Sequence, residues 1–243
     1  MRVGVIIPAH NEENSIGRVI SDLPKDQLAE IVVVNNNSSD NTESVAKNHG
    51  AIVLSESKKG YGWACLKGID YLVDKNIDVV VFLDGDYSDS PEEIKELLKP
   101  IKQGLYDFVI GSRVLGLSQK GSLLIHQRFG NKLATFLMSL FYGARYTDLG
   151  PFRAIKYDAL IGLKMIDKTY GWTVEMQIKA VKKKLKYIII HYTGMRREID
   201  AIRKLCDSRS KVSSHYFIKN NGNILNLVPD LYEAWHAGIS FWK

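Results

Sequence analysis

The chain has 243 residues, of which 45% are hydrophobic and 25% charged, which indicates a globular protein with one large domain or two small ones. Its formal charge of +6 suits a protein that handles phosphates or touches an anionic membrane, but no interleaved basic and aromatic residues favour nucleic acid. With only two cysteines, no recognisable signal peptide and no apolar run of membrane-spanning length, we expect a cytoplasmic protein without a disulfide framework.

Strands and helices alternate over the first half of the chain. Short, β-branched runs predict buried strands at residues 3–7, 31–34, 51–54, 78–83 and 108–110. Apolar residues at helical spacing predict helices from residue 16, from 42 to about 49, over 63–73 and over 91–103. This alternation predicts an α/β fold with a mostly parallel sheet, in which the polar loops after Pro8, Val34 and Leu83 meet at one edge.

The turn Asp84-Gly85-Asp86 lies between the strand at 78–83 and a helix start near Ser90. Two carboxylates at the carboxyl end of a central strand are suited to Mg²⁺ or Mn²⁺ shared with a phosphate. The glycine between them keeps the backbone open to a ligand. A capped turn with solvated carboxylates is the alternative interpretation of this segment taken by itself.

From residue 115 the alternation stops. Residues 130–142 predict a strongly apolar helix, which belongs either to the core, the interpretation we favour, or to a membrane interface. A turn at 147–153 supplies an acid and an arginine. Further elements are expected as helices at 157–165, 170–184 and 196–206, a strand at 187–190, and a hairpin with strands at 213–218 and 224–228.

Six short motifs follow one another along the first part of the chain, at residues 5–13, 33–42, 60–62, 84–86, 111–113 and 148–153. In their order and spacing they resemble the family 2 glycosyltransferases, and among these the polyprenyl-phosphate sugar synthases. The resemblance covers residues 1–187. It implies a GT-A fold, which is Rossmann-like with a mostly parallel central sheet flanked by helices, and an enzyme that transfers a sugar from a UDP- or GDP-linked donor with inversion.

The resemblance also implies roles for individual residues around the donor. A divalent cation on Asp84 and Asp86 would neutralise the diphosphate leaving group, acting as Lewis acid and template. The donor-binding residues would be Pro8, Asn11 and Glu12 at the nucleoside, with Asp84 and Gly85 beside them. Asn36 stands where the family usually has an aspartate that contacts the base. An amide donates as well as accepts hydrogen bonds, so the identity of the base stays open.

Four basic side chains are candidates to clamp phosphates of donor or acceptor. Arg113 and Arg153 are the ones for which we favour a catalytic role, whereas Arg128 and Lys59, the latter beside Gly60, are weaker candidates for donor binding. Ordinary surface charge is the alternative for each of them.

The acceptor decides whether a general base is needed. Transfer to a hydroxyl would require one, and Asp89 and Glu175 are the nearest candidates, although Glu175 could equally be an acid at a helix N-terminus or the partner of an arginine. A phosphate acceptor is already an anion and needs no base. The absence of a dedicated base therefore favours a polyprenyl phosphate, which would place the protein peripherally on the inner face of the membrane.

Residues 188–243 resemble a different family, the zinc N-acetylmuramoyl-L-alanine amidases. The similar segments lie at residues 190–195, 211–218, 227–229 and 234–242. The resemblance makes His191 the first zinc ligand and puts the other ligands beyond residue 243. A catalytic zinc takes about three protein ligands, so His191 is at most a vestigial ligand and we expect no amidase activity.

Three accounts of this C-terminal segment remain open. It is a fused, incomplete amidase-like α+β module, the account we favour, or a vestigial module that binds peptidoglycan fragments, or a set of strands that completes the transferase. We therefore predict a transferase domain at 1–187 and an incomplete amidase-like segment at 188–243. The alternative function is a catalytically inactive cell-wall-binding protein that works through this segment. The oligomeric state is left open.

Overall fold

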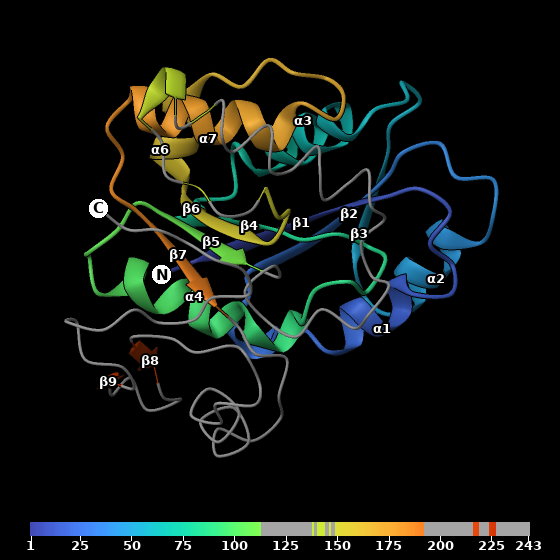
Figure 1. Ribbon diagram of the computed structural model, residues 1–243. Coiled ribbons are helices and arrows are strands. Elements are labelled where there is room, and N and C mark those ends of the chain that lie inside the picture. Colours follow the sequence, from blue (N-terminus) through green and yellow to red (C-terminus); the bar gives the residue numbers. More distant parts are fainter. Residues whose placement is uncertain are drawn as a thin grey trace, which may run out of the picture.

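A computed structural model describes residues 1–112, 138, 140–143, 146, 149–191, 216–218 and 224–226 of the chain, shown in Figure 1. For Ser112, His191 and the two short segments after residue 215, only the backbone is described. Arg113 and Arg128 therefore lie outside the described residues, as do most of the predicted helix at 130–142 and the whole of the predicted helix at 196–206.

Seven strands form one sheet in the order β3-β2-β1-β4-β6-β5-β7. Their bounds are Val3–Ala9 (β1), Glu30–Asn35 (β2), Ile52–Ser55 (β3), Val79–Phe82 (β4), Phe108–Ser112 (β5), Arg153–Lys156 (β6) and Tyr187–His191 (β7). β1 pairs in parallel with β2 and β4, β2 with β3, and β5 with β7. The predicted, mostly parallel sheet is confirmed.

The antiparallel strand β6 is the exception. It runs between β4 and β5 and pairs with both, with Phe82 opposite Arg153 in the first pairing and Ile110 opposite Arg153 in the second. The sequence predicted only a turn here. The strand has four residues between a turn and a helix, so its apolar run is too short to stand out.

Helices cover both faces of the sheet, which gives a three-layer α/β/α arrangement (Figure 1). α1, α2 and α4 lie on one face, with bounds Ile16–Ser21, Thr42–Asn48 and Ile94–Lys102. α3, α6 and α7 lie on the other, with bounds Tyr61–Leu72, Tyr157–Leu163 and Trp172–Lys182. Two short 3-10 turns are also present, η1 at Lys25–Gln27 and η2 at Pro91–Glu93, and residues 138 and 140–142 are helical. Among the described residues, no helix is both long enough and apolar enough to cross a membrane.

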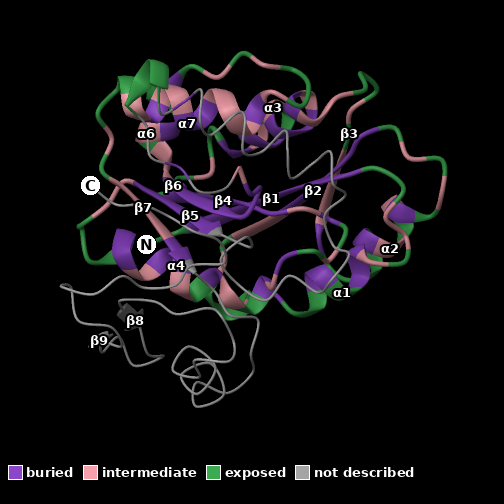
Figure 2. Cartoon of the chain, viewed as in Figure 1, coloured by how far each residue is buried: buried purple, intermediate pink, exposed green. Residues whose placement is uncertain are grey.

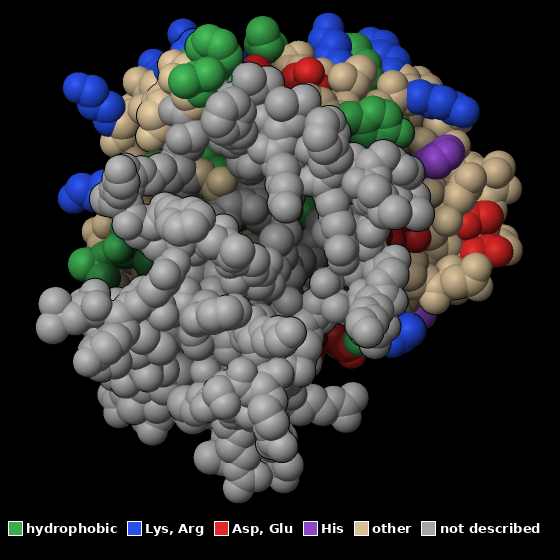
Figure 3. Space-filling view, in the orientation of Figure 1, with side chains coloured by type: hydrophobic (Ala, Val, Ile, Leu, Met, Phe, Trp, Pro, Cys, Tyr) green, Lys and Arg blue, Asp and Glu red, His purple; other side chains and the backbone are tan. Residues whose placement is uncertain are grey.

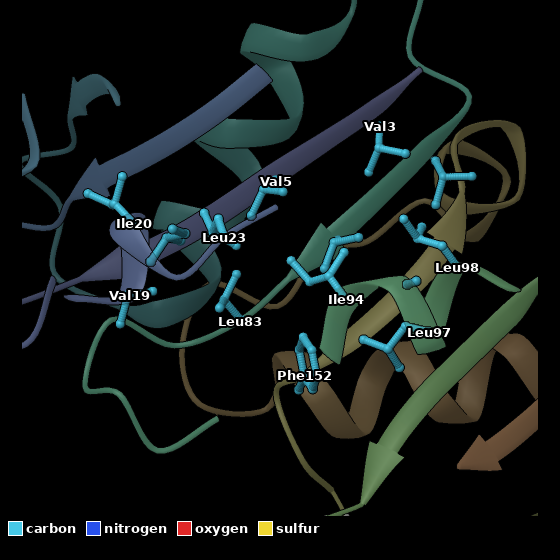
Figure 4. Close-up of a cluster of buried hydrophobic side chains, with 14 of the residues drawn as sticks. Val3, Val5, Val19, Ile20, Leu23, Leu83, Ile94, Leu97, Leu98 and Phe152 are labelled. Carbon is cyan, nitrogen blue, oxygen red and sulfur yellow. The ribbon is translucent and has the colours of Figure 1, made fainter. Parts of the chain in front are cut away.

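Strand residues alternate between two hydrophobic cores, one on each face of the sheet. Val5 of β1 joins the core under α1 and α4, and its neighbour Ile6 joins the core under α3 and α7. Figure 2 shows the resulting band of buried strands between the helical layers. Figure 4 shows the first core, where Leu83 and Phe152 lie among side chains from α1 and α4. The interior strands are therefore buried on both faces, as their β-branched composition predicts.

Strand β7 crosses the boundary predicted between residues 187 and 188. Its residues Ile188 to His191 pair with Val109 to Ser112 of β5, so the first residues of the amidase-like segment lie in the central sheet. Further along, β8 (Tyr216–Ile218) and β9 (Ile224–Asn226) form an antiparallel pair, which confirms the predicted hairpin. The domain boundary itself stays a prediction.

Candidate functional site

The carboxyl ends of β1, β2 and β4 bring three polar loops to one edge of the sheet. These loops follow strands that pair in parallel, so they leave the sheet at the same edge. Gly85 lies against the first loop: a Cβ atom added to it would be 3.4 Å from Ala9 Cβ and from Glu12 Cγ. The turn that carries Asp84 and Asp86 therefore packs directly on the loop after β1, as the sequence predicts.

The loop after β1 is hydrogen-bonded to the loop after β2. The backbone N–H of Glu12 donates to Thr42 Oγ1 at 2.7 Å, and the N–H of Glu13 donates to Asp40 Oδ2 at 3.1 Å. The side chain of Asn11 accepts from the N–H of Ser39 at 2.8 Å. Asn11 has a φ of 59°, a left-handed conformation that asparagine tolerates better than most residues. The two loops therefore form one fixed wall of the site. Pro8 lies further back, buried within β1 and opposite Val34.

Asn36 ties the loop after β3 to this wall. Its amide nitrogen donates to the carbonyls of Glu56 at 3.2 Å and Lys58 at 2.7 Å, and its oxygen accepts from the N–H of Gly60 at 2.9 Å. The residue is 8% exposed. An aspartate, the residue expected at this position from the family pattern, has no N–H to donate. The two carbonyl acceptors therefore account for an amide at position 36. The contact of Asn36 with a nucleotide base stays a prediction.

The glycines around Tyr61 allow an unusually close backbone contact. A Cβ atom on Gly60, which has a φ of 145°, would lie 2.2 Å from the carbonyl oxygen of Lys168, and one on Gly62 would lie 2.2 Å from that of Asp167. The N–H of Gly62 donates to the carbonyl of Thr169 at 3.1 Å. The start of α3 is thus pinned to residues 167–169. Lys59 precedes this contact with an exposed side chain.

The two carboxylates of the Asp84-Gly85-Asp86 turn have different surroundings. Asp84 is half-buried and accepts a hydrogen bond from the Tyr61 hydroxyl at 3.0 Å. Asp86 is exposed, and its Oδ1 accepts from the N–H of Ser88 at 2.9 Å. Among the residues that the structure describes, no group of three or more acidic, histidine or cysteine side chains is arranged around a metal position. Two carboxylates nevertheless fit Mg²⁺ or Mn²⁺, because such ions complete their coordination with phosphate oxygens and water.

The pKa of Glu12 reflects the negative electrostatic potential at this edge of the sheet. Burial of its carboxyl raises its pKa above the ordinary value, a hydrogen bond from Ser15 works in the opposite direction, and the charges of Asp86 and Asp40 raise it further. Glu12 and Asp86 are therefore close enough to repel each other. A cation placed between such groups is favoured on electrostatic grounds.

Arg153, predicted to clamp a phosphate, is buried in the structure. It is 1% exposed, and its guanidinium donates to the carbonyls of Leu149 at 3.1 Å and Pro151 at 3.3 Å, to that of Gly150, and across to Thr173 at 3.3 Å. This arrangement joins the turn before β6 to the first residues of α7. Its role toward a phosphate stays a prediction.

Glu175, a candidate general base, lies in the first turn of α7 and holds a loop in place. Its carboxylate accepts from the N–H of Ile166 at 3.0 Å and of Asp167 at 2.8 Å, and it pairs with Lys179 at 2.6 Å. These contacts agree with the alternative interpretation, in which Glu175 is an acid at a helix N-terminus. Asp89, the other candidate base, is buried. His191, predicted as a vestigial zinc ligand, is described by its backbone alone.

The residue that sequence reasoning missed is Tyr61. Tyr61 belongs to the motif at residues 60–62, but the sequence assigns no partner to its hydroxyl. Burial, and then the negative charge of Asp84, raise the pKa of Tyr61 well above its ordinary value, so the hydroxyl keeps its proton and donates. The same two causes raise the pKa of the neighbouring Cys65 thiol. Nothing in a sequence relates Tyr61 to a carboxylate 23 positions away.

Two family models match the chain. Residues 4–201 match the model described as glycosyl transferase family 2, and residues 181–242 match the one described as N-acetylmuramoyl-L-alanine amidase. Both predicted resemblances are therefore confirmed. The two matches overlap over residues 181–201, the range that contains β7.

Individual proteins support the same assignment. Glycosyltransferase AglJ of Haloferax volcanii is 26% identical over 208 residues, which cover 83% of this chain and 67% of AglJ. UDP-N-acetylglucosamine–dolichyl-phosphate N-acetylglucosaminyltransferase of Methanococcus voltae is 28% identical over 202 residues, which cover 74% of this chain and 80% of that protein.

A solved structure with the same fold is that of glucosyl-3-phosphoglycerate synthase from Mycobacterium tuberculosis, in complex with Mn²⁺, UDP-glucose and glycerol 3-phosphate. It superposes with a TM-score of 0.62 at 20% identity, covering 84% of this chain and 75% of that one. At this identity the likeness concerns the fold alone, and it confirms the predicted GT-A architecture.

Proposed function

Because the chain belongs to glycosyl transferase family 2, we propose that it transfers a sugar from a nucleotide-sugar to a polyprenyl phosphate with the help of Mg²⁺ or Mn²⁺. The observation that carries this proposal is the position of the Asp84-Gly85-Asp86 turn. It lies at the carboxyl edge of the parallel strands and is packed on the loop that carries Glu12. Ligands of open α/β sheets bind at this edge.

Several residues of the chain contribute to donor binding in this proposal. A divalent cation on Asp84 and Asp86 would supply the positive charge that a departing diphosphate requires. Tyr61 holds the Asp84 carboxylate, and the N–H of Ser88 holds that of Asp86. Asn36 fixes the loop that carries Lys59, a candidate to contact the phosphates. These contacts prepare the acidic side of the site before the donor arrives.

A phosphate acceptor agrees with the surroundings of the acidic side chains. Glu175 is held by two backbone N–H groups and by Lys179, which suits a structural acid better than a base that must exchange protons. An acceptor phosphate oxygen is already charged. It would form the new bond to the anomeric carbon while the diphosphate leaves with the electron pair from the opposite face, which gives inversion. The Methanococcus voltae relative is named for transfer to dolichyl phosphate.

The described part of the predicted apolar helix supports contact with a membrane surface. Met138 is buried, but Leu140 and Phe141 are 64% and 70% exposed, so this part of the helix is only partly core. The ring of Tyr142 lies 4.9 Å from Lys182 Nζ. Figure 3 shows hydrophobic side chains along the upper edge of the molecule among those of lysine and arginine. Apolar groups beside cations are suited to an anionic membrane surface, where a lipid phosphate would be met.

A transfer assay tests the proposal. The purified protein would be incubated with labelled UDP- and GDP-sugars, Mn²⁺ and a polyprenyl phosphate in detergent, and the labelled lipid measured. We expect Asp84→Ala to lower the rate by about 10²-fold or more, because the diphosphate charge is no longer neutralised. Asp26→Ala, an exposed acid on η1, is the matched control and should behave as the parent. Equal activity in Asp84→Ala and the parent would reject the proposal.

A second candidate function rests on the amidase match over residues 181–242. In this proposal the C-terminal segment binds peptidoglycan fragments without cleaving them. Binding of a soluble muropeptide by the parent and by Asp84→Ala, together with absence of transfer in both, would support it. Elemental analysis provides a further check, because we expect the purified protein to carry no stoichiometric zinc.

A further inference from the structure

The Tyr61 hydroxyl and the Asp84 carboxylate are joined by a hydrogen bond of 3.0 Å. We propose that Tyr61 is a positioning residue, whose hydroxyl holds the Asp84 carboxylate in the orientation that binds the metal–diphosphate group. This inference rests on the proposed function, since it takes Asp84 as a ligand of that group. Tyr61 itself does not touch the donor in this account.

Tyr61 is suited to this task because its own position is fixed. It is the first residue of α3, and the glycines on both sides of it pack against the backbone of residues 167–168. The N–H groups of Gly62 and Trp63 donate to the carbonyls of Thr169 and Lys168 at 3.1 and 3.2 Å. Because the start of α3 is fixed, the Tyr61 side chain has few alternative positions. Its hydroxyl therefore determines the orientation of the Asp84 carboxylate.

The supporting segment is fixed in turn by Glu175. Its carboxylate accepts from the N–H groups of Ile166 and Asp167, and the carbonyl of Asp167 is also the group that lies against Gly62. A continuous set of contacts therefore runs from α7 through residues 166–169 to Tyr61 and ends at Asp84. This gives Glu175 a role at a distance from the chemistry, which a general base does not have.

One hydroxyl can orient the carboxylate without using up its capacity as a ligand. A carboxylate offers about four lone-pair positions, of which the Tyr61 hydroxyl occupies one on Oδ1. The hydroxyl end of Tyr61 is enclosed although the residue as a whole is half-buried, so water competes little for this bond. The hydrogen bond thus restricts rotation of Asp84 and uses only one of these positions itself.

Tyr61→Phe tests the inference because it removes only the hydroxyl oxygen. Removing a group that orients a metal ligand typically lowers metal affinity by about 10- to 100-fold. We expect Mn²⁺ to bind about tenfold more weakly to this variant in the presence of saturating UDP or, in parallel, GDP. The electron paramagnetic resonance signal of free Mn²⁺, compared with that of the same nucleotide mixture without protein, gives the affinity. Tyr71→Phe, on the same helix but about 15 Å further along it, is the matched control and should bind as the parent.

A double-mutant cycle with Asp84→Asn separates this inference from the proposed function. We expect Asp84→Asn to bind Mn²⁺ weakly, and Tyr61→Phe to add no further loss in that background. If Asp84→Asn binds as the parent, or the parent binds no Mn²⁺ with either nucleotide, the proposed function fails. If Asp84→Asn is weak but Tyr61→Phe stays within about twofold of the parent, only the inference fails. An equal loss from Tyr61→Phe in both backgrounds also overturns it, because the hydroxyl would then act on the fold and not through Asp84.

Discussion

Replacing Asn36 by aspartate should destabilise this protein, even though aspartate is the residue that the family pattern leads one to expect there. The change keeps the size and the acceptor that meets the N–H of Gly60, but it removes both donors. The carbonyls of Glu56 and Lys58, at 3.2 and 2.7 Å from the amide nitrogen, would then face a negative oxygen.

The magnitude follows from those two contacts. A buried acceptor that loses its donor costs about 1–3 kcal/mol, so the two carbonyls together give about 2–6 kcal/mol. Because the loop at 56–60 is at the surface and can relax, we expect the free energy of unfolding to fall by about 2–3 kcal/mol at pH 7.5, the lower part of the combined range.

The loss should depend on pH in a defined direction. The carbonyl oxygens of Glu56 and Lys58 would raise the folded-state pKa of the carboxyl introduced at position 36. Its protonated form can donate one hydrogen bond to them, whereas its ionised form is repelled by them. A raised folded-state pKa means that the penalty is small below the unfolded-state pKa and grows as the pH rises through the folded-state pKa. Asn36→Asp should therefore be closer to the parent at pH 4 than at pH 7.5.

Urea unfolding followed by circular dichroism at both pH values measures these effects. Asn48→Asp, at an exposed position at the end of α2, is the matched control, and its change should stay within about 0.5 kcal/mol. A loss at position 36 no larger than that of the control, or a loss that grows toward low pH, would show that the amide does not hold the loop in this way.

Three further predictions address other contacts of the site. Gly62→Ala should lower the free energy of unfolding by about 2 kcal/mol or more, because its Cβ would lie 2.2 Å from the Asp167 carbonyl oxygen. Gly162→Ala, where a Cβ meets nothing within 4 Å, should be neutral or stabilising; comparable thermal unfolding of the two variants would contradict this. Glu175→Gln should keep the transfer rate within about tenfold of the parent, whereas loss of a general base would lower it by about 10²-fold or more. Glu12→Gln should be more stable than the parent at pH 7.5 and lose that advantage toward pH 4, because the Glu12 pKa is raised in the folded state; urea midpoints that show the opposite trend would refute this assignment.

The arrangement of the strands was predictable because a strand that is buried on both faces appears in the sequence as a run of apolar residues. The run at 78–83 is almost wholly apolar, and β4 is indeed buried on both faces with a carboxylate turn after it. Parallel pairing then determined which loops share an edge. β6 left no such record, since four residues that begin with a buried arginine look like part of a turn.

The roles of single polar side chains were less predictable, because their partners are distant in the sequence. Asn36 bonds to residues 20 to 24 positions away, and Tyr61 to one 23 positions away. For Arg153 the residue type indicates only a strong donor. Whether its donors meet a phosphate or backbone carbonyls depends on how the turn at 149–151 folds around it.

In the proposed function, Asp84 and Asp86 hold a divalent cation against the donor diphosphate. Crystals grown with Mn²⁺ and UDP or GDP, measured at the manganese absorption edge, test it most directly. We expect an anomalous peak about 2.1 Å from a carboxylate oxygen of this pair, next to the diphosphate. A bound nucleotide with no peak beside these carboxylates, or with its diphosphate elsewhere, would show that Asp84 and Asp86 do not hold the cation.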